Sequence, residues 1–496
     1  MIDCDAVEVE AGKFEDTKRL RVLLVAPLQA DANVQNWGAP SLGLMRIDSY
    51  VKKRVKNVEI EIFDPQIDFY DPLKKFAETT IHIIGISILH YTLTETLDFI
   101  HQWRKIHPES LIVVGGNEAS ANYQDIFDKS PCDIAVLIEG EEVMLKIILW
   151  QQGKLKLEAV PGIVYRRYAE MVDEDKFWDF WKDVNFADYR YPAYWQETAK
   201  LFEQPNWEEV CCIRLTPSNY CKRKCTFCSL NFVHNICCNQ NAKPVALKGW
   251  QIMELIDKIK VQVPKTRTIY FCNDDIFYPN RQYFEDFVEL YEKSGYDYRI
   301  IVQTSSYCLK EADFPLLKWI GCVHISVGVE NASERLRKSM KKPQDSEKIE
   351  MIVDWSHQYG IKVYYLIILI PPESTLEELW LNIRTIRRWM AAGVGISIMP
   401  VIYAYRGMPL FEDNRYQIMY RTKLIGATGV MYNDPYCVLP NDPVVRELTL
   451  EFIQREWDYV NKRYEERENK LKFKGGTSEF LLDLLEELLL KYEEKI

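Results

Sequence analysis

Three cysteines lie close together near the middle of the chain, in the stretch from Cys221 to Cys228 that reads CKRKCTFC. Thiolates are the ligands that iron–sulfur clusters prefer, and Cys221, Cys225 and Cys228 can bind three irons of a 4Fe–4S cubane from one short loop. The fourth iron then has no protein ligand. A zinc knuckle or a disulfide is the alternative, but no second Cys/His pair follows at zinc-finger spacing. The pattern therefore predicts a cluster with one open iron.

This motif resembles the signature of the radical S-adenosylmethionine (SAM) superfamily, C-x3-C-x2-C with an aromatic residue before the last cysteine, here Phe227. The resemblance implies that the open iron binds the amino and carboxylate groups of SAM. It also implies that an electron from the cluster splits the sulfonium to give a 5'-deoxyadenosyl radical, with Phe227 near the adenine. Lys222, Arg223 and Lys224 add positive charge beside a cluster that accepts an electron.

The composition is that of an ordinary globular protein, with 47% hydrophobic and 27% charged residues. A length of 496 residues predicts about three domains. The net charge of -11 argues against nucleic acid or an anionic membrane as the main partner. No apolar run reaches membrane-spanning length and the acidic start is unlike a signal peptide, so we expect a cytoplasmic protein. Thirteen cysteines then indicate reduced thiols and metal chemistry, and an oxygen-sensitive cluster favours an anaerobic setting.

Short apolar runs alternate with helical patterns over residues 1–150. The helical patterns begin near Ser41 and cover Leu93 to Ile106, whereas the strand-like runs are Arg21 to Pro27, Val58 to Phe63, His82 to Ser87, Leu111 to Val114 and Asp133 to Ile138. Strand alternating with helix predicts a doubly wound, Rossmann-like parallel sheet. Ligands in such sheets bind beyond the carboxyl ends of the strands.

This first domain resembles the cobalamin-binding domain that precedes many radical SAM barrels, through PSLGL at 40–44, GIS at 85–87, GGNEAS at 115–120 and the EGEE run that follows Ile138. A scaffold or partner surface without cofactor is the alternative. The resemblance implies cobalamin contacts from the following residues: Trp37, Ser41, Leu42, Gly43, Ser87, His90, Tyr91, Gly115, Gly116, Asn117, Glu118 and Gly140.

One departure from the cobalamin pattern concerns the lower face of the cobalt. The D-x-H-x-x-G motif, whose histidine binds cobalt in other cobalamin enzymes, is replaced by ADANVQNWG. The lower face is then empty or covered by a loop residue, for which Trp37 is the candidate, with Asn33 and Gln35 behind it. The alternative for Trp37 is ordinary packing, and the alternative for His90 is a structural histidine.

An aromatic-rich connector, residues 151–205, leads to a second run of alternating strands and helices over residues 206–410. The tract from Phe177 to Tyr194 is expected to form a strap packed over both domains. Six βα units after a cysteine loop predict a partial (β/α)6 barrel, the radical SAM barrel, with cofactors at the carboxyl ends of its strands. A small, mostly helical region, 411–496, completes the predicted α/β chain.

Several segments resemble the parts of the superfamily that bind SAM. FCNDDIF at 271–277 resembles the acidic turn after the second strand, which implies SAM contacts from Asp274 and Asp275. SVGVENASERLRKSMKK at 326–342 resembles the segment whose glutamate, here Glu330, hydrogen-bonds SAM, while Arg335 or Lys341 engages its carboxylate. The weaker candidates follow the third strand and are Gln303 and Ser305. Each residue has a structural alternative as a helix cap or a solvated charge.

The end of the last strand supplies candidates for the substrate pocket, Tyr403, Tyr405 and Arg406, unless these side chains fill the open side of the barrel. Two vicinal cysteine pairs flank the cluster loop, Cys211-Cys212 and Cys237-Cys238. Vicinal pairs lack the C-x2-C spacing of auxiliary clusters, and free cysteine is often buried, so we interpret both pairs as structural.

Together the two resemblances imply a cobalamin-dependent radical SAM C-methyltransferase. Such an enzyme removes hydrogen from an unactivated carbon with the 5'-deoxyadenosyl radical and transfers a methyl group from methylcobalamin. The expected partners are SAM, an electron donor such as flavodoxin or ferredoxin, and a protein, peptide or small-molecule substrate. Three alternatives remain: a cobalamin-dependent cyclase or oxidase without net methylation, an enzyme that transfers another part of SAM, and a non-catalytic cobalamin or iron–sulfur sensor.

Overall fold

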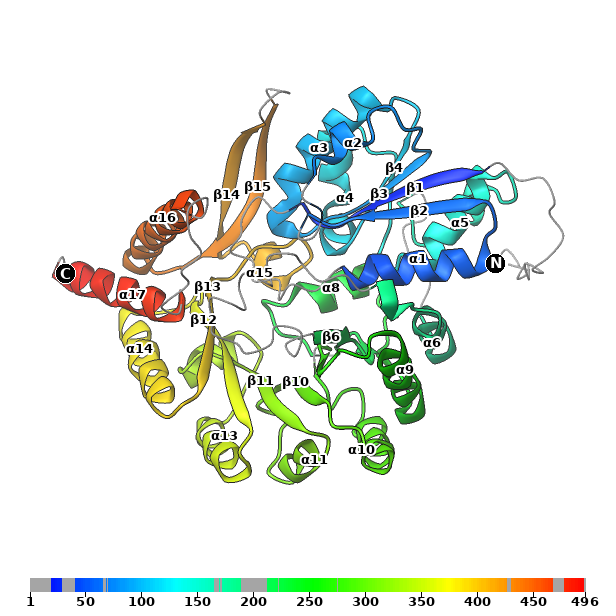
Figure 1. The fold of residues 1–496 in the computed structure, drawn as a ribbon. Coiled ribbons are helices and arrows are strands. Elements are labelled where there is room, and N and C mark those ends of the chain that lie inside the picture. Colours follow the sequence, from blue (N-terminus) through cyan, green and yellow to red (C-terminus); the bar gives the residue numbers. More distant parts are fainter. Residues whose placement is uncertain are drawn as a thin grey trace.

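The computed structural model describes residues 19–28, 41–65, 68, 70–164, 169, 172–188, 212–221, 223–273, 275–425, 430–466 and 477–494. Statements about structure below concern these residues. Figure 1 shows the N-terminal α/β domain in blue and cyan above a larger α/β barrel in green and yellow, with an orange and red C-terminal region beside both.

The N-terminal domain is built on a five-stranded parallel sheet in the order β2-β1-β3-β4-β5. This is the flavodoxin-like order, in which the strand order reverses between β1 and β3. Separate hydrophobic clusters on the two faces of the sheet confirm the doubly wound prediction. The strands are β1 (Leu20–Val25), β2 (Val58–Phe63), β3 (Ile83–Ser87), β4 (Leu111–Gly115) and β5 (Ile134–Ala135), and the main helices are α1 (Leu42–Arg54), α3 (Leu93–Ile106), α4 (Asn117–Lys129) and α5 (Glu141–Gln151).

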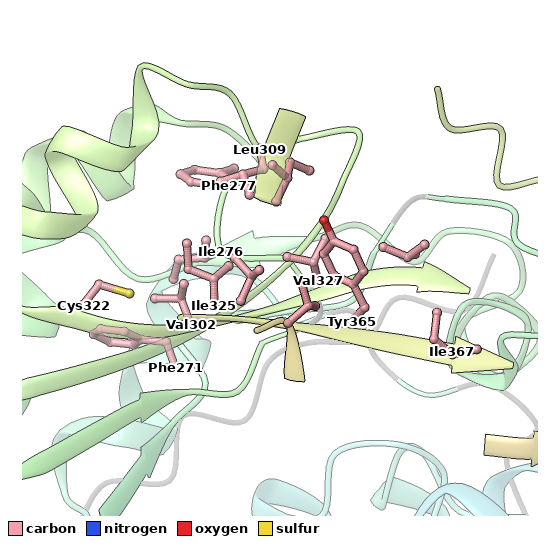
Figure 2. Packing of buried hydrophobic residues seen from close by; sticks show 14 of the residues in the cluster. Phe271, Ile276, Phe277, Val302, Leu309, Cys322, Ile325, Val327, Tyr365 and Ile367 are labelled. Atoms are coloured by element: carbon pink, nitrogen blue, oxygen red, sulfur yellow. The ribbon is translucent and has the colours of Figure 1, made fainter. Parts of the chain in front are cut away.

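The second domain is a six-stranded parallel sheet in the order β13-β12-β11-β10-β9-β6, as predicted for a partial barrel. Buried residues at alternate strand positions, among them Val302, Ile325, Val327 and Ile367, pack against the surrounding helices (Figure 2). The strands are β6 (Cys212–Leu215), β9 (Thr268–Phe271), β10 (Arg299–Ser305), β11 (Cys322–Glu330), β12 (Lys362–Ile370) and β13 (Gly395–Val401), and the helices are α9 (Gly249–Gln262), α10 (Gln282–Ser294), α11 (Asp313–Trp319), α13 (Ser346–Tyr359) and α14 (Leu376–Ala391).

The described part of the aromatic connector contains helix α6 (Glu174–Lys182), which packs between the two domains. Phe180 meets Tyr50 of α1 edge to face at 5.4 Å, and the guanidinium of Arg46 lies 5.2 Å from the Trp181 ring centroid. The Arg54 side chain donates to Asp183 at 2.8 Å. These contacts join α1 of the N-terminal domain to the barrel core.

The C-terminal region contains an antiparallel hairpin that the sequence analysis missed, β14 (Gln417–Ile425) and β15 (Val430–Leu439). The hairpin is joined to the barrel domain just after β13, because the Val438 amide donates to the Ile402 carbonyl at 3.0 Å. It also reaches the N-terminal domain, where Asp434 accepts a hydrogen bond from Thr94 of α3, and Figure 1 shows it rising beside that domain. The polar residues and the proline within β15 hid the strand pattern.

Two helices complete the chain, α16 (Pro443–Glu466) and α17 (Thr477–Glu493), in agreement with the predicted helical region. A buried stripe on α16 runs through Val445, Leu448 and Phe452. Glu456 continues this stripe one turn further, and its carboxylate makes no hydrogen bond or ion pair with another residue that the structure describes. Burial raises the pKa of Glu456 to about 7.

Replacing Glu456 with glutamine should stabilise the protein increasingly as the pH rises from about 5 to about 8. The folded chain holds the Glu456 proton up to about pH 7, whereas an unfolded glutamate loses it above roughly pH 4.3. The wild type therefore loses stability across this range, and the neutral amide does not. Thermal melting of both proteins across the pH series tests this, with the exposed Glu447→Gln as control. A melting difference that stays constant with pH would contradict the prediction.

Candidate functional site

The cysteine loop follows strand β6 and so lies at the carboxyl end of the barrel sheet. Cys221 and Cys225 are buried and Cys228 is half-buried. The Thr226 amide donates to the Met340 carbonyl at 3.0 Å, which ties the loop to the segment after β11. Helix α8 (Ser229–Cys237) begins directly after Cys228. The loop is therefore held at the barrel end where the loops after β9, β10 and β11 meet.

Two cations lie beside this loop. Lys342 Nζ is 5.9 Å from the ring centroid of Phe227, and the Arg223 guanidinium donates to Cys308 Sγ at 3.0 Å. Burial raises the pKa of the Cys225 thiol, and Lys342 and Arg223 oppose that rise. Such cations favour thiolates and offset the negative charge of a three-thiolate cluster.

Whether the loop can hold an iron–sulfur cluster depends on the ligand atoms that its side chains offer. Within the described parts of the chain, no group of three or more His, Cys, Asp or Glu side chains forms a closed metal site. The three soft donors on one loop, with cations beside them, nevertheless have the chemistry that a 4Fe–4S cluster requires. Cys221, Cys225 and Cys228 are the residues that would hold it.

Glu330 ends strand β11 in a conformation that is unusual for a residue with a side chain, with φ at +71°. The strand register shifts between Gly328 and Glu330, and the Glu330 carboxylate forms an ion pair with Lys342. Only 10% of the Glu330 side chain and 11% of the Lys342 side chain are exposed. Strained backbone of this kind concentrates at functional sites.

Gly328 provides the space for this ion pair. A Cβ at Gly328 would lie 2.6 Å from Lys342 Nζ and 2.8 Å from Glu330 Oε1. The sequence analysis missed both Lys342 and Gly328, although both lie in the segment that it singled out. Glycine at an inward strand position was the signal that could have identified Gly328.

The structure does not bring Arg335 into this group. Arg335 is 54% exposed in its side chain and pairs with Glu378, with Nε 2.9 Å from Oε1. Lys341 is exposed as well. Arg337, which is buried, donates to the carbonyls of Asn331 at 2.7 Å and Gln344 at 3.0 Å and so fixes the loop after β11.

Asp275 and Ser305, both predicted from the sequence, are in direct contact. One Asp275 oxygen accepts from Ser305 Oγ at 2.9 Å and the other from Thr304 Oγ1 at 2.8 Å. This fixes the turn after β9 onto the end of β10. Gln303 accepts from the Tyr270 hydroxyl at 3.0 Å. Asp274 lies outside the described residues.

A second site lies in the N-terminal domain, in a pocket of about 720 Å³ of enclosed and open space between the sheet and helices α1 and α5. Of the residues predicted to contact cobalamin, those that line the pocket are Ser41, Gly43, Ser87, Gly115, Gly116 and Gly140. Leu42 and Asn117 stand next to lining residues along the chain, the Tyr91 side chain is not described, and Trp37, Asn33 and Gln35 lie outside the described residues.

The lining of this pocket includes a glycine that no other residue can replace and a buried ion pair. A Cβ at Gly116, where φ is +94°, would lie 2.7 Å from the Ile88 carbonyl oxygen, so only glycine fits there. Arg46 pairs with Glu141 at 2.7 Å and lies 3.5 Å from Glu139. Burial raises the pKa of Glu141 to about 7, against the effect of Arg46. The sequence analysis did not single out Arg46 or Glu141 individually.

Replacing Gly43 with leucine should empty this pocket of cofactor without unfolding the domain. No atom lies within 4 Å of a Cβ placed at Gly43, so a leucine side chain can extend into the pocket. Helix α1 gains about 0.5–1 kcal/mol from losing a glycine. We expect corrin binding to weaken at least about tenfold, with unchanged or slightly raised thermal stability. Corrin absorbance after gel filtration measures this, with Gly43→Ala as control. Full corrin retention by the leucine variant would contradict this assignment of the pocket.

The two domains meet at residues that were predicted for different roles. His90 Nδ1 lies 3.1 Å from Glu118 Oε2, and the His90 ring lies 4.4 Å from the ring of Tyr405 between centroids. Arg406 donates to Asp125 of α4 at 2.7 Å. Tyr405 and Arg406 therefore face the N-terminal domain.

Tyr403 lies beside the hairpin and forms an isolated antiparallel bridge with Cys437 of β15. Its ring meets that of Tyr436 at 5.6 Å, and burial raises its pKa well above the usual range. Its ring and its backbone are therefore both in contact with the hairpin.

Of the two vicinal cysteine pairs, Cys237 and Cys238 are buried, whereas Cys212 is half-buried. Burial raises the pKa of Cys237 to about 12 and that of Cys238 to about 11. Thiols with such values stay protonated at neutral pH and are poor metal ligands. Cys212 is the first residue of β6, and Cys211 lies outside the described residues.

Within the described ranges, no helix combines the length and apolar character needed to cross a membrane.

Two family models match the chain. The model of the radical SAM superfamily matches residues 215–386, and that of the B12 binding domain matches residues 38–148. A comparison with curated proteins found no match. Radical SAM domains use a 4Fe–4S cluster and SAM, and B12 binding domains bind cobalamin.

Solved structures with the same fold include TsrM, a radical SAM methyltransferase from Kitasatospora setae. With tryptophan substrate and a SAM analogue bound, it has a TM-score of 0.62 and 14% identity over 79% of this chain and 75% of that chain. The structure of TsrM with cobalamin and a 4Fe–4S cluster bound has a TM-score of 0.60 and 12% identity over 97% of this chain and 100% of that chain. The cobalamin-dependent SAM radical enzyme OxsB, with aqua-cobalamin and SAM bound, has a TM-score of 0.57 and 20% identity over 76% of this chain and 53% of that chain.

Proposed function

We propose that this protein, a cobalamin-dependent radical SAM enzyme that joins a B12 binding domain to a radical SAM domain, is a C-methyltransferase. When bound, the cluster with SAM supplies a radical that removes hydrogen from carbon, and cobalamin supplies a carrier for a methyl group. The substrate class that we propose is a protein or peptide side chain or a small molecule with an unactivated carbon. Flavodoxin or ferredoxin is the proposed electron donor.

The observation that carries this proposal is the direct contact between the domain that holds the pocket and the domain that holds the cysteine loop. The pocket with Ser87, Gly115 and Gly116 lies at the carboxyl end of the N-terminal sheet, and the cysteine loop lies at the carboxyl end of the barrel. The contacts His90–Tyr405 and Arg406–Asp125 join the two domains directly, the first from the turn after β3 and the second from α4. A methyl carrier and a hydrogen-abstracting centre must act on one carbon, which requires this kind of placement.

The residues of this chain have separate tasks in the proposal. Cys221, Cys225 and Cys228 hold the cluster, and Phe227 lies beside it. The Glu330 carboxylate, which is paired with Lys342, accepts hydrogen bonds from the SAM ammonium or ribose, and the Asp275–Ser305 contact shapes the neighbouring wall. Tyr405 and Arg406 close the seam between the domains and exclude water from the reacting carbon.

The proposal is tested with S-adenosylmethionine that carries a deuterated methyl group. The anaerobic, reduced enzyme with its three cofactors should form 5'-deoxyadenosine and should also pass the deuterated methyl group to the bound corrin. The first product reports on the cysteine loop and the second on the corrin site, and neither measurement requires the substrate to be known.

The outcomes separate the alternative functions. Formation of 5'-deoxyadenosine without any label on the corrin would favour a cyclase or oxidase, whereas formation of 5'-methylthioadenosine that keeps the deuterated methyl group would favour transfer of another part of SAM, such as the aminocarboxypropyl group. Binding of cluster and corrin without SAM cleavage would favour a sensor. Each of these three results would contradict methyl transfer.

A further inference from the structure

A row of polar side chains crosses the inner face of the barrel sheet. On β6, Arg214 is half-buried, whereas Ile213 and Leu215 on either side of it are 0% and 1% exposed and belong to the core between the sheet and the helices. On β12, Tyr364 alternates with buried neighbours in the same way. Because successive strand residues point to opposite faces, Arg214 and Tyr364 lie on the inner face. Their partial exposure shows that this face is not closed off by packing.

The row continues from strand to strand. Arg214 is in register with Tyr270 of β9, and the Tyr270 hydroxyl donates to Gln303 of β10 at 3.0 Å. Gln303 is in register with Ser326 of β11, and Ser326 is in register with Tyr364 of β12. Neighbouring strands lie about 4.8 Å apart, so these side chains form one connected polar surface.

His324 belongs to the same row and carries no charge. Its ring stacks on that of Tyr364 with centroids 3.9 Å apart, and its Nε2 lies 3.0 Å from Ser326 Oγ. Burial and the nearby charge of Lys362 lower the pKa of His324 to about 4, so the ring is neutral at pH 7. Arg214 is therefore the charged member of the row.

Arg214 lacks an anionic partner. It makes no hydrogen bond or ion pair with any other residue that the structure describes. Among the residues of the six barrel strands the only carboxylate is Glu330, which is paired with Lys342. A guanidinium is always charged in proteins and offers five N–H donors. A half-buried charge without a partner costs free energy, which a bound anion offsets.

A cavity reaches this row at one edge of the sheet. It holds about 700 Å³ of enclosed and open space, and its lining includes Lys362 and Tyr364 of β12, Gly395 of β13, and Ser478 and Glu479 of α17. Gly395 makes room for the Tyr364 ring, because a Cβ there would lie 2.3 Å from Cδ1 of that ring. The end of the row at Tyr364 is therefore accessible from outside the barrel.

The row lies below the residues that we assign to SAM. Gln303 stands two residues before Ser305 on β10, and Ser326 stands four residues before Glu330 on β11. At about 3.3 Å per residue, the second separation spans about 13 Å along the strand. A ligand held by the row therefore needs an extended chain of about this length to bring a carbon to the carboxyl end of the barrel.

We propose that this row binds the carboxylate of an elongated substrate, with Arg214 as the anion-binding residue and Gln303 as a second donor. The guanidinium fork matches the geometry of a carboxylate. The Tyr270 hydroxyl holds the Gln303 side chain through its oxygen, which leaves the Gln303 NH2 group to donate. The proposal rests on the proposed function in naming this ligand as the substrate. It narrows the substrate class to small molecules or side chains that carry a carboxylate.

Arginine-selective modification of the complete enzyme, with cluster and cobalamin, tests the site. Reaction with p-hydroxyphenylglyoxal is followed at each arginine by peptide mass spectrometry. Hexanoate is the probe, and hexanamide is its uncharged match. As hexanoate approaches saturation, the rate at Arg214 should fall at least about tenfold. Hexanamide should leave this rate unchanged, and the exposed Arg384 of α14 should respond to neither compound. Equal effects of the two compounds at Arg214, or protection by inorganic phosphate alone, would overturn the proposal.

Variants show whether the probe acts through Arg214. Hexanoate should raise the melting temperature of the wild type and of Arg384→Gln, but not that of Arg214→Gln. Without hexanoate, Arg214→Gln should melt at the wild-type temperature or above it, because the change removes a charge that has no partner. A clear fall in that temperature, or a hexanoate shift that persists in Arg214→Gln, would overturn the proposal. Formation of 5'-deoxyadenosine and of labelled corrin is measured without hexanoate, so a failure of the proposed function is distinct from a failure of this site.

Discussion

Replacing Cys225 with alanine should abolish formation of 5'-deoxyadenosine from SAM. Cys225 is the middle ligand of a loop that supplies three thiolates, and a cubane held by the remaining pair has two open irons. The rate should fall by far more than the roughly 10- to 100-fold that loss of an outer-shell partner costs. Iron content after anaerobic reconstitution should fall with it. Chromatographic detection of 5'-deoxyadenosine after reduction with dithionite measures the effect.

Cys322 provides the matched control for Cys225. It is also a buried cysteine of the barrel, but burial raises its pKa to about 12, and its thiol donates to the His324 carbonyl at 3.4 Å. Cys322→Ala should therefore leave iron content and SAM cleavage near the wild-type values. Equal loss in both variants, or full activity in Cys225→Ala, would contradict the assignment of the cysteine loop.

Replacing Lys342 with methionine should produce the largest loss of stability in the barrel. The change leaves the Glu330 carboxylate buried without its partner, and breaking such a pair costs about 3–5 kcal/mol. A loss of that size lowers the melting temperature of a domain of this size by roughly 10 °C. Thermal melting measures this, with the exposed Lys338→Met as control, because Lys338 pairs with Glu334 on the surface.

The double variant Lys342→Met with Glu330→Gln separates stability from SAM binding. It removes both charges, so most of the lost stability should return. SAM binding should remain weak, because the carboxylate that we assign to the SAM ammonium or ribose is gone. A double variant that binds SAM as the wild type does would contradict the role of Glu330.

The parts of the site that lie on one short segment could be predicted from the sequence. The cysteine loop, the segment around Glu330 and the glycines that line the N-terminal pocket are local patterns, so their spacing carries the information. The alternation of strands and helices was sufficient for both sheets because each strand of a parallel sheet is a buried apolar run. The barrel sheet has the six parallel strands that the sequence predicts.

The parts that depend on distant residues could not be predicted. One segment carries three cationic side chains, Arg335, Lys341 and Lys342, and the sequence does not distinguish which of them pairs with Glu330. In the folded chain the register of β11 shifts after Gly328, and Lys342 forms the ion pair with Glu330. His90 and Tyr405 are far apart in the chain and meet only when the two domains pack. The hairpin β14–β15 stayed hidden because its strands pair with each other and with the segment after β13, away from the parallel sheets.

In this account, one iron of the cluster has no protein ligand and binds SAM. Mössbauer spectroscopy of the 57Fe-loaded enzyme, before and after addition of SAM, is the most direct test of this assignment. We expect a 4Fe–4S cluster in which one iron changes its isomer shift and quadrupole splitting when SAM binds, while the other irons keep theirs. A spectrum that SAM leaves unchanged, or a protein that takes up no cluster, would contradict the account.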